Sequence, residues 1–161
     1  MSTRPHTFER TSVVEAPREA VWARIVTPQG INDEMMPLLR MAMPRGARGL
    51  TVDTVEVGRK VGRCRLYLFG IVPFDYDDLM LAELEPGRRF LERSTMASMS
   101  TWEHERTLTA LGAARTRVHD RVCFAPRRPI AVVPGLPGLL ERAIGRFFAH
   151  RHRRLQRHFE G

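Results

Sequence analysis

Two neighbouring predicted strands, residues 101–111 and 115–124, carry ionisable side chains among large apolar ones. Because successive side chains of a strand point to opposite faces, we expect the face with the large apolar members to be the inner one. His104 and Arg106 lie on that face of the first strand, and Asp120 lies on it in the second. A three-residue loop between the strands would place Arg106 directly opposite Asp120, as a cross-strand pair of opposite charges.

The preceding predicted strand, residues 89–97, adds polar groups to the same face. If residues 98–100 form the loop after it, the facing pairs are Glu92 with Arg106, Ser94 with His104, and Met96 with Trp102. The pattern therefore predicts an inner ladder in which Arg106 lies between two carboxylates.

This polar cluster has three interpretations. Ionised groups are rarely buried unless paired, since desolvating an unpaired charge is expensive, so the first is an ion-pair ladder that stabilises the fold. In the second, Arg106 and His104 hold an oxygen-bearing ligand. In the third they are catalytic candidates, because histidine titrates near neutral pH and suits acid–base chemistry.

The sequence gives little support for a metal-binding site or a catalytic nucleophile. Asp75, Asp77 and Asp78 lie close together, but they lack the glycine and terminal glutamate of a calcium loop and are interpreted as a solvated strand start. His150 and His152 are two residues apart on a predicted helix, so they project to different sides and cannot share a metal ion. We find no zinc motif, phosphate loop or nucleophile elbow, and we predict neither a metal site nor a cofactor.

The composition is that of an ordinary globular protein of 161 residues, 43% of them hydrophobic and 27% charged. The polar N-terminus lacks the apolar core of a signal peptide, and the charge-free stretch 129–140 is short and broken by prolines. We therefore expect a cytoplasmic protein without a transmembrane segment. In that reducing compartment Cys64 and Cys123 are interpreted as small buried side chains.

Positive charge gathers at the C-terminus. The net charge is +8, and Lys60 is the single lysine among 26 basic residues, a ratio typical of GC-rich coding. The arginines of the last 20 residues are Arg142, Arg146, Arg151, Arg153, Arg154 and Arg157. They suit the C-terminal end of a helix; the alternative is binding to RNA, the ribosome or an anionic membrane. No motif that reads nucleic acid accompanies them, so no specific nucleic-acid partner is predicted.

The elements that must position these groups follow an α+β order, with strands in a run and helices at the ends. A strand at 8–16 precedes a helix that begins near Pro17; residues 28–30 break it, and a second short helix follows at 32–39. Residues 35–49 are expected to form a loop. The other six of seven predicted strands are 50–57, 63–69, 74–84, 89–97, 101–111 and 115–124.

A proline-rich connector, residues 125–138, leads to an amphipathic C-terminal helix. Its apolar stripe is predicted to comprise Leu140, Ile144, Phe147, Phe148, Arg151, Leu155 and Phe159.

The element order, together with the opening FERTSVVEAPREAVWARI, resembles the START-like (SRPBCC) superfamily of helix-grip proteins. This group includes birch-pollen-type allergens, polyketide cyclases and lipid-transfer domains. The resemblance implies a single ligand-binding domain over residues 1–161, in which a curved antiparallel sheet grips the C-terminal helix around a cavity.

In such a domain we expect a small apolar or aromatic ligand; a cyclase- or aromatase-type enzyme is the alternative. The residues predicted to line the cavity are Glu92, Ser94, Met96, Trp102, His104, Arg106, Asp120, Val122, Phe147 and Phe148. Met35, Met36, Met41 and Met43 are expected to border its mouth, where flexible thioethers adapt to varied apolar shapes. Tyr67 and Phe69 fall on the other face of their strand, which is either exposed to solvent or a contact of a homodimer.

Overall fold

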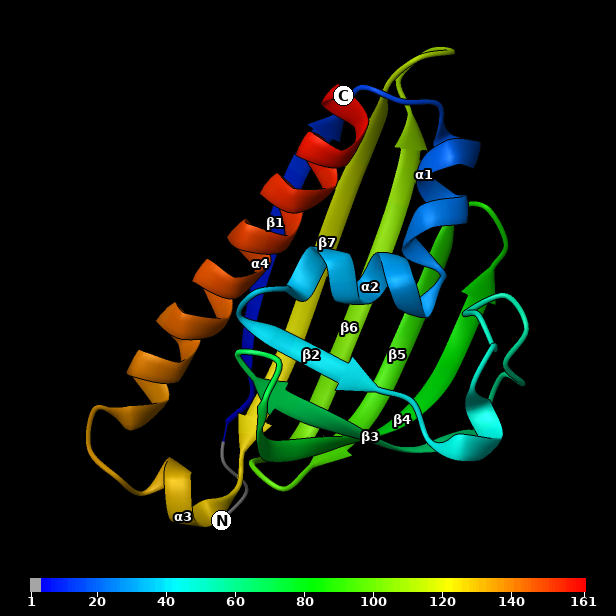
Figure 1. Cartoon of the computed structure of the whole chain (residues 1–161). Coiled ribbons are helices and arrows are strands. Elements are labelled where there is room, and N and C mark those ends of the chain that lie inside the picture. The colour runs from blue at the N-terminus through cyan, green and yellow to red at the C-terminus, as the bar shows by residue number, and fades with distance from the viewer. Residues whose placement is uncertain (1–3) are drawn as a thin grey trace.

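The chain begins with a strand and two short helices, continues through six strands, and ends with a long helix (Figure 1). The computed structural model describes residues 4–161, in which the elements are β1 (His6–Val14), α1 (Arg18–Ile25), α2 (Pro28–Met35), β2 (Leu39–Ala42), the 3-10 turn η1 (Arg45–Ala47), β3 (Lys60–Leu68), β4 (Val72–Glu85), β5 (Arg89–Met96), β6 (Met99–Ala110), β7 (Thr116–Pro126), α3 (Arg128–Ala131) and α4 (Leu136–Glu160).

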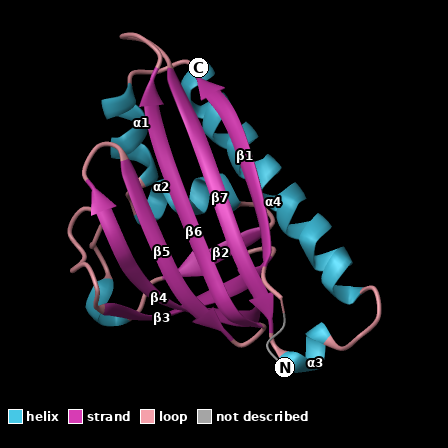
Figure 2. Ribbon diagram, turned by 180° about the vertical axis from the view of Figure 1, so that it is seen from behind, coloured by secondary structure: helices cyan, strands magenta, loops and turns pink. Residues whose placement is uncertain are grey.

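The seven strands form one antiparallel sheet in the order β1-β7-β6-β5-β4-β3-β2. Helices α1, α2 and α4 lie on one face of this curved sheet, and Figure 2 shows the strands from the opposite side. The predicted α+β class, with a seven-stranded antiparallel sheet around a long C-terminal helix, is confirmed. None of the helices within residues 4–161 has the length and apolar character needed to cross a membrane.

One of the predicted strands is wrong. Residues 50–57 form turns instead of a strand, and the seventh strand is β2, inside the segment expected to be a loop. The alternating apolar residues suggested a strand, but Val52 and Val55 pack against the core from a turn. The Val52 amide there donates to the Val26 carbonyl at 2.9 Å. On β2, the side chain of Asn32 binds both the amide and the carbonyl of Met41, which satisfies these backbone groups.

The predicted end of the first helix before Pro28 is confirmed, but the second helix begins at Pro28 and not at residue 32. Thr27 caps the helix by accepting from the Gly30 amide at 3.0 Å, and Pro28 takes the first position, where its missing N–H is not needed. Glycine is required at position 30, since a Cβ atom there would lie 1.8 Å from the Arg24 carbonyl oxygen. This close approach packs α1 against α2.

The C-terminal helix is confirmed and is longer than predicted, since α4 starts within the expected connector. Of the predicted stripe, Phe148, Arg151 and Leu155 are buried. Phe148 meets Phe8 of β1 edge-on at 5.5 Å between ring centres, and Leu155 packs into the core cluster that contains Trp22. The helix therefore joins two core clusters along its length.

The cysteines are both free, with Cys64 buried on β3 and Cys123 half-buried on β7. Burial raises the pKa of the Cys64 thiol to about 12, so this side chain is a neutral thiol in the core.

Candidate functional site

A cavity of about 610 Å³ lies between the inner face of the sheet and the helices. Most of its wall is apolar, with Leu66, Leu81 and Phe90 from the strands and Ile144 and Phe147 from α4. Ligand pockets commonly have this size and character, with a few polar groups among apolar ones.

Three of the four methionines expected at the cavity mouth, Met35, Met41 and Met43, are wall residues, and Met36 is not. That they border the mouth stays a prediction. Phe69 and Phe74 belong to the wall and are also exposed to solvent, which places them where the cavity opens.

The ten residues predicted for the cavity divide into two groups. Those in its wall are Glu92, Met96, Trp102, His104 and Phe147. Those buried outside the wall are Ser94, Arg106, Asp120, Val122 and Phe148. That the first group contacts a ligand remains a prediction.

The predicted pairing of Arg106 with Asp120 across β6 and β7 is confirmed. The two side chains form a fork, with Arg106 Nε 2.7 Å from Asp120 Oδ1 and Nη2 2.7 Å from Oδ2. Such two-pronged bonds are among the strongest that an arginine makes.

The predicted partner of Arg106 on β5 is wrong. Glu92 lies opposite His104, Ser94 lies opposite Trp102, and Phe90 faces Arg106. The register differs by two residues because β5 ends at Met96 and β6 begins at Met99, leaving a tighter turn than expected. A shift of two keeps every side chain on its predicted face, which explains why the inner face was right while the partners were not.

Asp75 stabilises this tighter turn. Its carboxylate accepts from the Ala97 amide at 2.8 Å and from the Ser98 hydroxyl. These bonds join β4 to the turn between β5 and β6, a long-range contact that strand alternation does not reveal.

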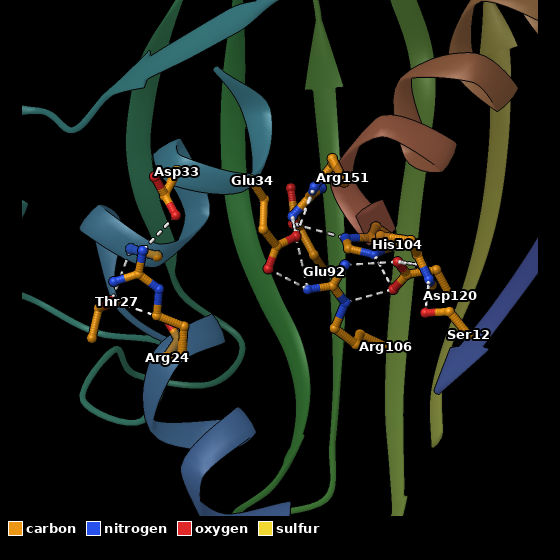
Figure 3. A network of polar contacts seen from close by, with 12 residues as sticks. Ser12, Arg24, Thr27, Asp33, Glu34, Glu92, His104, Arg106, Asp120 and Arg151 are labelled. Atoms are coloured by element: carbon orange, nitrogen blue, oxygen red, sulfur yellow. Dashed lines mark hydrogen bonds and ion pairs between the residues drawn. The ribbon is translucent and has the colours of Figure 1, made fainter. Parts of the chain in front are cut away.

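The carboxylate that completes the arginine site comes from α2. Glu34 is 2% exposed, and its two oxygens lie 2.8 and 3.0 Å from Arg106 Nη1. Arg151 of α4 donates from Nε to the same carboxylate at 3.1 Å (Figure 3). Sequence reasoning missed Glu34, because it lies 72 residues from Arg106 and on a helix placed only by the tertiary structure.

Two histidines bind the other carboxylate of this network. His104 Nε2 lies 2.9 Å from Asp120 Oδ1, and His152 Nε2 lies 2.7 Å from Oδ2. Burial alone would lower the pKa of His104, but the charge of Asp120 outweighs it and raises that pKa. Burial prevails at His152 and lowers its pKa. His104 therefore holds its proton to a higher pH than an ordinary histidine, and His152 loses its proton at a lower one.

Both carboxylates bound to Arg106 remain ionised. Burial opposes their charge, but the guanidinium of Arg106 outweighs it and holds the pKa of Glu34 below its ordinary value and that of Asp120 well below. Arg106 is 1% exposed and all its side-chain nitrogens are bonded to these carboxylates. This geometry favours the ion-pair interpretation for Arg106.

Asp77 departs from the expected solvated strand start. Its side chain is 5% exposed and forms part of the cavity wall, on the same face of β4 as Leu79 and Leu81. Asp78 points the other way and pairs with Lys60 at 2.8 Å. The expectation treated neighbouring aspartates as one solvated group, whereas alternation along the strand separates them.

The basic C-terminal helix directs part of its charge inward. Arg151 is in the buried network, Arg154 binds Asp33 of α2 at 2.9 and 3.1 Å, and His150 contacts the Met36 carbonyl at 2.8 Å. The exposed arginines are Arg142, Arg146, Arg153 and Arg157. A surface for RNA or an anionic membrane remains a prediction that would rest on these four. Across residues 4–161, no three His, Cys, Asp or Glu side chains are grouped so as to hold a metal ion.

Comparison with known proteins places this site in a family context. A family model described as a domain of unknown function (DUF8410) matches residues 12–159. The Zhui aromatase/cyclase from Streptomyces sp. R1128 is similar in structure, with a TM-score of 0.72 and 18% identity over 98% of this chain and 94% of its own. No curated protein matches the chain.

Two further solved structures share the fold. A protein from Chromobacterium violaceum has a TM-score of 0.71 and 15% identity, over 96% of this chain and 98% of its own. A START superfamily protein from Mycobacterium smegmatis has a TM-score of 0.64 and 14% identity, over 96% of this chain and 97% of its own. At these identities the likeness establishes the START-like fold.

Proposed function

The chain belongs to the DUF8410 family and has a START-like fold, and from this premise we propose that it binds a small apolar or aromatic molecule between sheet and helix. The observation that carries the proposal is the cavity of about 610 Å³ with its mainly apolar wall. Apolar surface of this kind releases free energy when a ligand removes it from water.

The ion-pair network supports the proposal by its position. Arg106, Glu34 and Asp120 occupy the space between α2, α4 and the strands, outside the cavity wall. They hold the helices against the sheet without filling the cavity, and the large aromatic residues Phe90 and Trp102 still face the open space.

The test is saturable binding of N-phenyl-1-naphthylamine, a neutral dye that fluoresces in apolar surroundings. We expect wild-type protein to bind it, and Leu79→Trp, which places a larger side chain in the cavity wall, to lose most of that binding. Native mass spectrometry of the purified protein should in parallel reveal a co-purified small molecule.

The matched control is Leu139→Trp, because Leu139 is 62% exposed and outside the cavity wall. This variant should bind the dye as wild type does. Equal binding by wild type and Leu79→Trp, with both variants folded, would contradict a ligand site in this cavity.

A cyclase- or aromatase-type activity is the second candidate. It is supported by the likeness to the Streptomyces aromatase/cyclase and by the place of His104 in the cavity wall. Incubation with a linear poly-β-ketone separates the two proposals: an enzyme converts it to a cyclised product, whereas a binding protein is only stabilised by it.

A further inference from the structure

Three acidic residues belong to the cavity wall, and one of them, Asp75, is bonded to the turn between β5 and β6. The other two, Asp77 on β4 and Glu92 on β5, lie on neighbouring strands. Ser94, next to Glu92 on the same face, donates its hydroxyl to Glu92 Oε1 at 3.3 Å. These residues form a polar corner, here called the Asp77 corner, in a wall that is otherwise mostly apolar.

The Asp77 corner differs from every other buried polar group in residues 4–161. Asp77 Oδ1 is the one buried side-chain nitrogen or oxygen there that lacks a hydrogen-bond partner. Buried polar groups in folded proteins are nearly always paired, because an unpaired one costs about 1–3 kcal/mol of desolvation. An unpaired group in the wall of a cavity is therefore positioned for a partner that enters the cavity.

The two carboxyl groups differ in charge. Burial opposes ionisation of Glu92, but the hydrogen bond and charge of His104 outweigh it and lower the Glu92 pKa. Burial, and then the charge of Glu92, raise the pKa of Asp77 well above its ordinary value. Asp77 therefore keeps its proton to a higher pH than an ordinary aspartic acid, and a protonated carboxyl group can both donate and accept a hydrogen bond.

We propose that the Asp77 corner selects the ligand, so that the cavity takes an uncharged, mainly apolar molecule whose hydroxyl or carbonyl group hydrogen-bonds to Asp77. This inference rests on the proposed binding function and specifies its ligand class. The carboxylate of Glu92 repels an anionic ligand, and the nearby His104 is already paired with Glu92 and Asp120. A charged ligand would also lose its hydration in a cavity whose wall is mostly apolar.

Arg151 is the cation that could bind an anionic ligand in the cavity, but it is already paired with Glu34. Arg151 is also a wall residue, but Glu34 Oε2 binds its Nε and Nη2 atoms, each at 3.1 Å. Its guanidinium also lies 5.1 Å from the centre of the Phe148 ring. A carboxylate or phosphate ligand would have to displace these contacts.

The test uses four naphthalene probes of similar shape: 2-naphthol, 2-methylnaphthalene, 2-naphthoate and 2-naphthylmethylamine. Equilibrium dialysis at neutral pH measures the binding of each one. We expect 2-naphthol to bind about 5-fold more tightly than 2-methylnaphthalene, as one net hydrogen bond implies. The anion should bind more weakly than 2-naphthol because Glu92 repels it. The cation should also bind more weakly, because Glu92 is already paired with His104 and the ammonium group would lose its hydration.

Two variants of the same residue assign the preference. Asp77→Leu should remove the advantage of 2-naphthol over 2-methylnaphthalene, while Asp77→Asn, which keeps a neutral hydrogen-bonding group, should retain most of it. Asp78→Asn is the matched control, because Asp78 is the next residue of β4 and pairs with Lys60 away from the cavity. It should behave as wild type.

The failures of the two proposals are distinguishable. If no probe binds to wild type, the binding function itself fails and the inference fails with it. If the probes bind but Asp77→Leu keeps the preference for 2-naphthol, or if wild type favours the anion or the cation, the cavity is a binding site and the role given to Asp77 is wrong.

Discussion

The Arg106 network and the Asp77 corner both bury carboxyl groups between the sheet and the helices, but the surroundings of these groups differ. In the network, Glu34 and Asp120 each accept two hydrogen bonds from Arg106. In the corner, one oxygen of Asp77 has no partner among residues 4–161. The two regions are connected, because His104 contacts Asp120 through one nitrogen and Glu92, at 3.9 Å, through the other.

The contrast teaches that burial alone does not decide the state of an acid. The guanidinium of Arg106 outweighs desolvation and lowers the pKa of Asp120, whereas burial and the neighbouring carboxylate of Glu92 raise the pKa of Asp77. The first arrangement stabilises the fold, and the second leaves hydrogen-bonding capacity facing the cavity.

The largest expected effect is that of Arg106→Met, which leaves two carboxylates buried without their cation. Breaking a buried ion pair from one side typically costs about 3–5 kcal/mol of unfolding free energy. Urea denaturation measures the loss. The same substitution in a Glu34→Gln, Asp120→Asn background should cost much less, and a loss below about 1 kcal/mol in the wild-type background would contradict the network's role.

The second largest effect is expected in the pH dependence of the unfolding free energy, which reports the same network. Glu34 and Asp120 have folded pKa values below their ordinary 4.5 and 3.8, so their contribution is complete above those values and is lost as the pH falls through the lowered pKa values. His104, raised above 6.5, contributes fully below pH 6.5, and this is lost as the pH rises through its raised pKa.

Urea denaturation at a series of pH values measures both parts of this curve, the loss of stability at acid pH (the acid limb) and the loss at alkaline pH (the alkaline limb). Glu34→Gln should flatten the acid limb while leaving the alkaline limb of His104 in place. An acid limb of unchanged steepness in Glu34→Gln would show that other carboxylates govern acid unfolding.

Asp77→Asn should change stability in the opposite direction. Because its folded pKa is raised, Asp77 favours the fold below pH 3.8, and this contribution is lost as the pH rises through the raised pKa. At neutral pH the amide avoids this loss, and we expect an increase in unfolding free energy on the order of 1 kcal/mol. Thermal or urea denaturation at pH 7 measures it, and a marked decrease would mean that Asp77 is ionised and paired.

The smallest effect is expected for Asp78→Asn, the neighbour of Asp77 on the outer face. Its ion pair with Lys60, whose side chain is 67% exposed, is a surface pair, and such pairs contribute about 0–1 kcal/mol. Denaturation under the same conditions provides the measurement. A change as large as that of Asp77→Asn would remove the distinction between the inner and outer faces of β4.

Local patterns predicted which faces point inward and the pair of Arg106 with Asp120, but not the partners on β5. Alternation along β6 and β7 placed His104, Arg106 and Asp120 correctly on the inner face. The partner on β5 was missed by two residues, since the turn at Ala97 and Ser98 is bound by Asp75 from a different strand. Side-chain alternation has a period of two, so it cannot distinguish two pairings that differ by a register shift of two residues.

Contacts between segments far apart in the chain were the hardest to predict from the sequence. Glu34 lies on a helix whose start was misplaced, because Pro28 was interpreted as a break although a first-turn proline is compatible with a helix. Asp77 was grouped with its acidic neighbours, and only the curvature of the sheet and the packing of α4 show that it faces a cavity.

The sequence by itself determined the order of elements, the α+β class, the apolar stripe of the C-terminal helix and the inner face of the central strands. These follow from side-chain periodicity and turn residues, which act over a few residues. The tertiary structure alone decided that Glu34 joins Asp120 on Arg106 and that Oδ1 of Asp77 lies at the cavity without a hydrogen-bond partner. Charge states depend on neighbours and on distance from water, and both are set only when distant segments pack together.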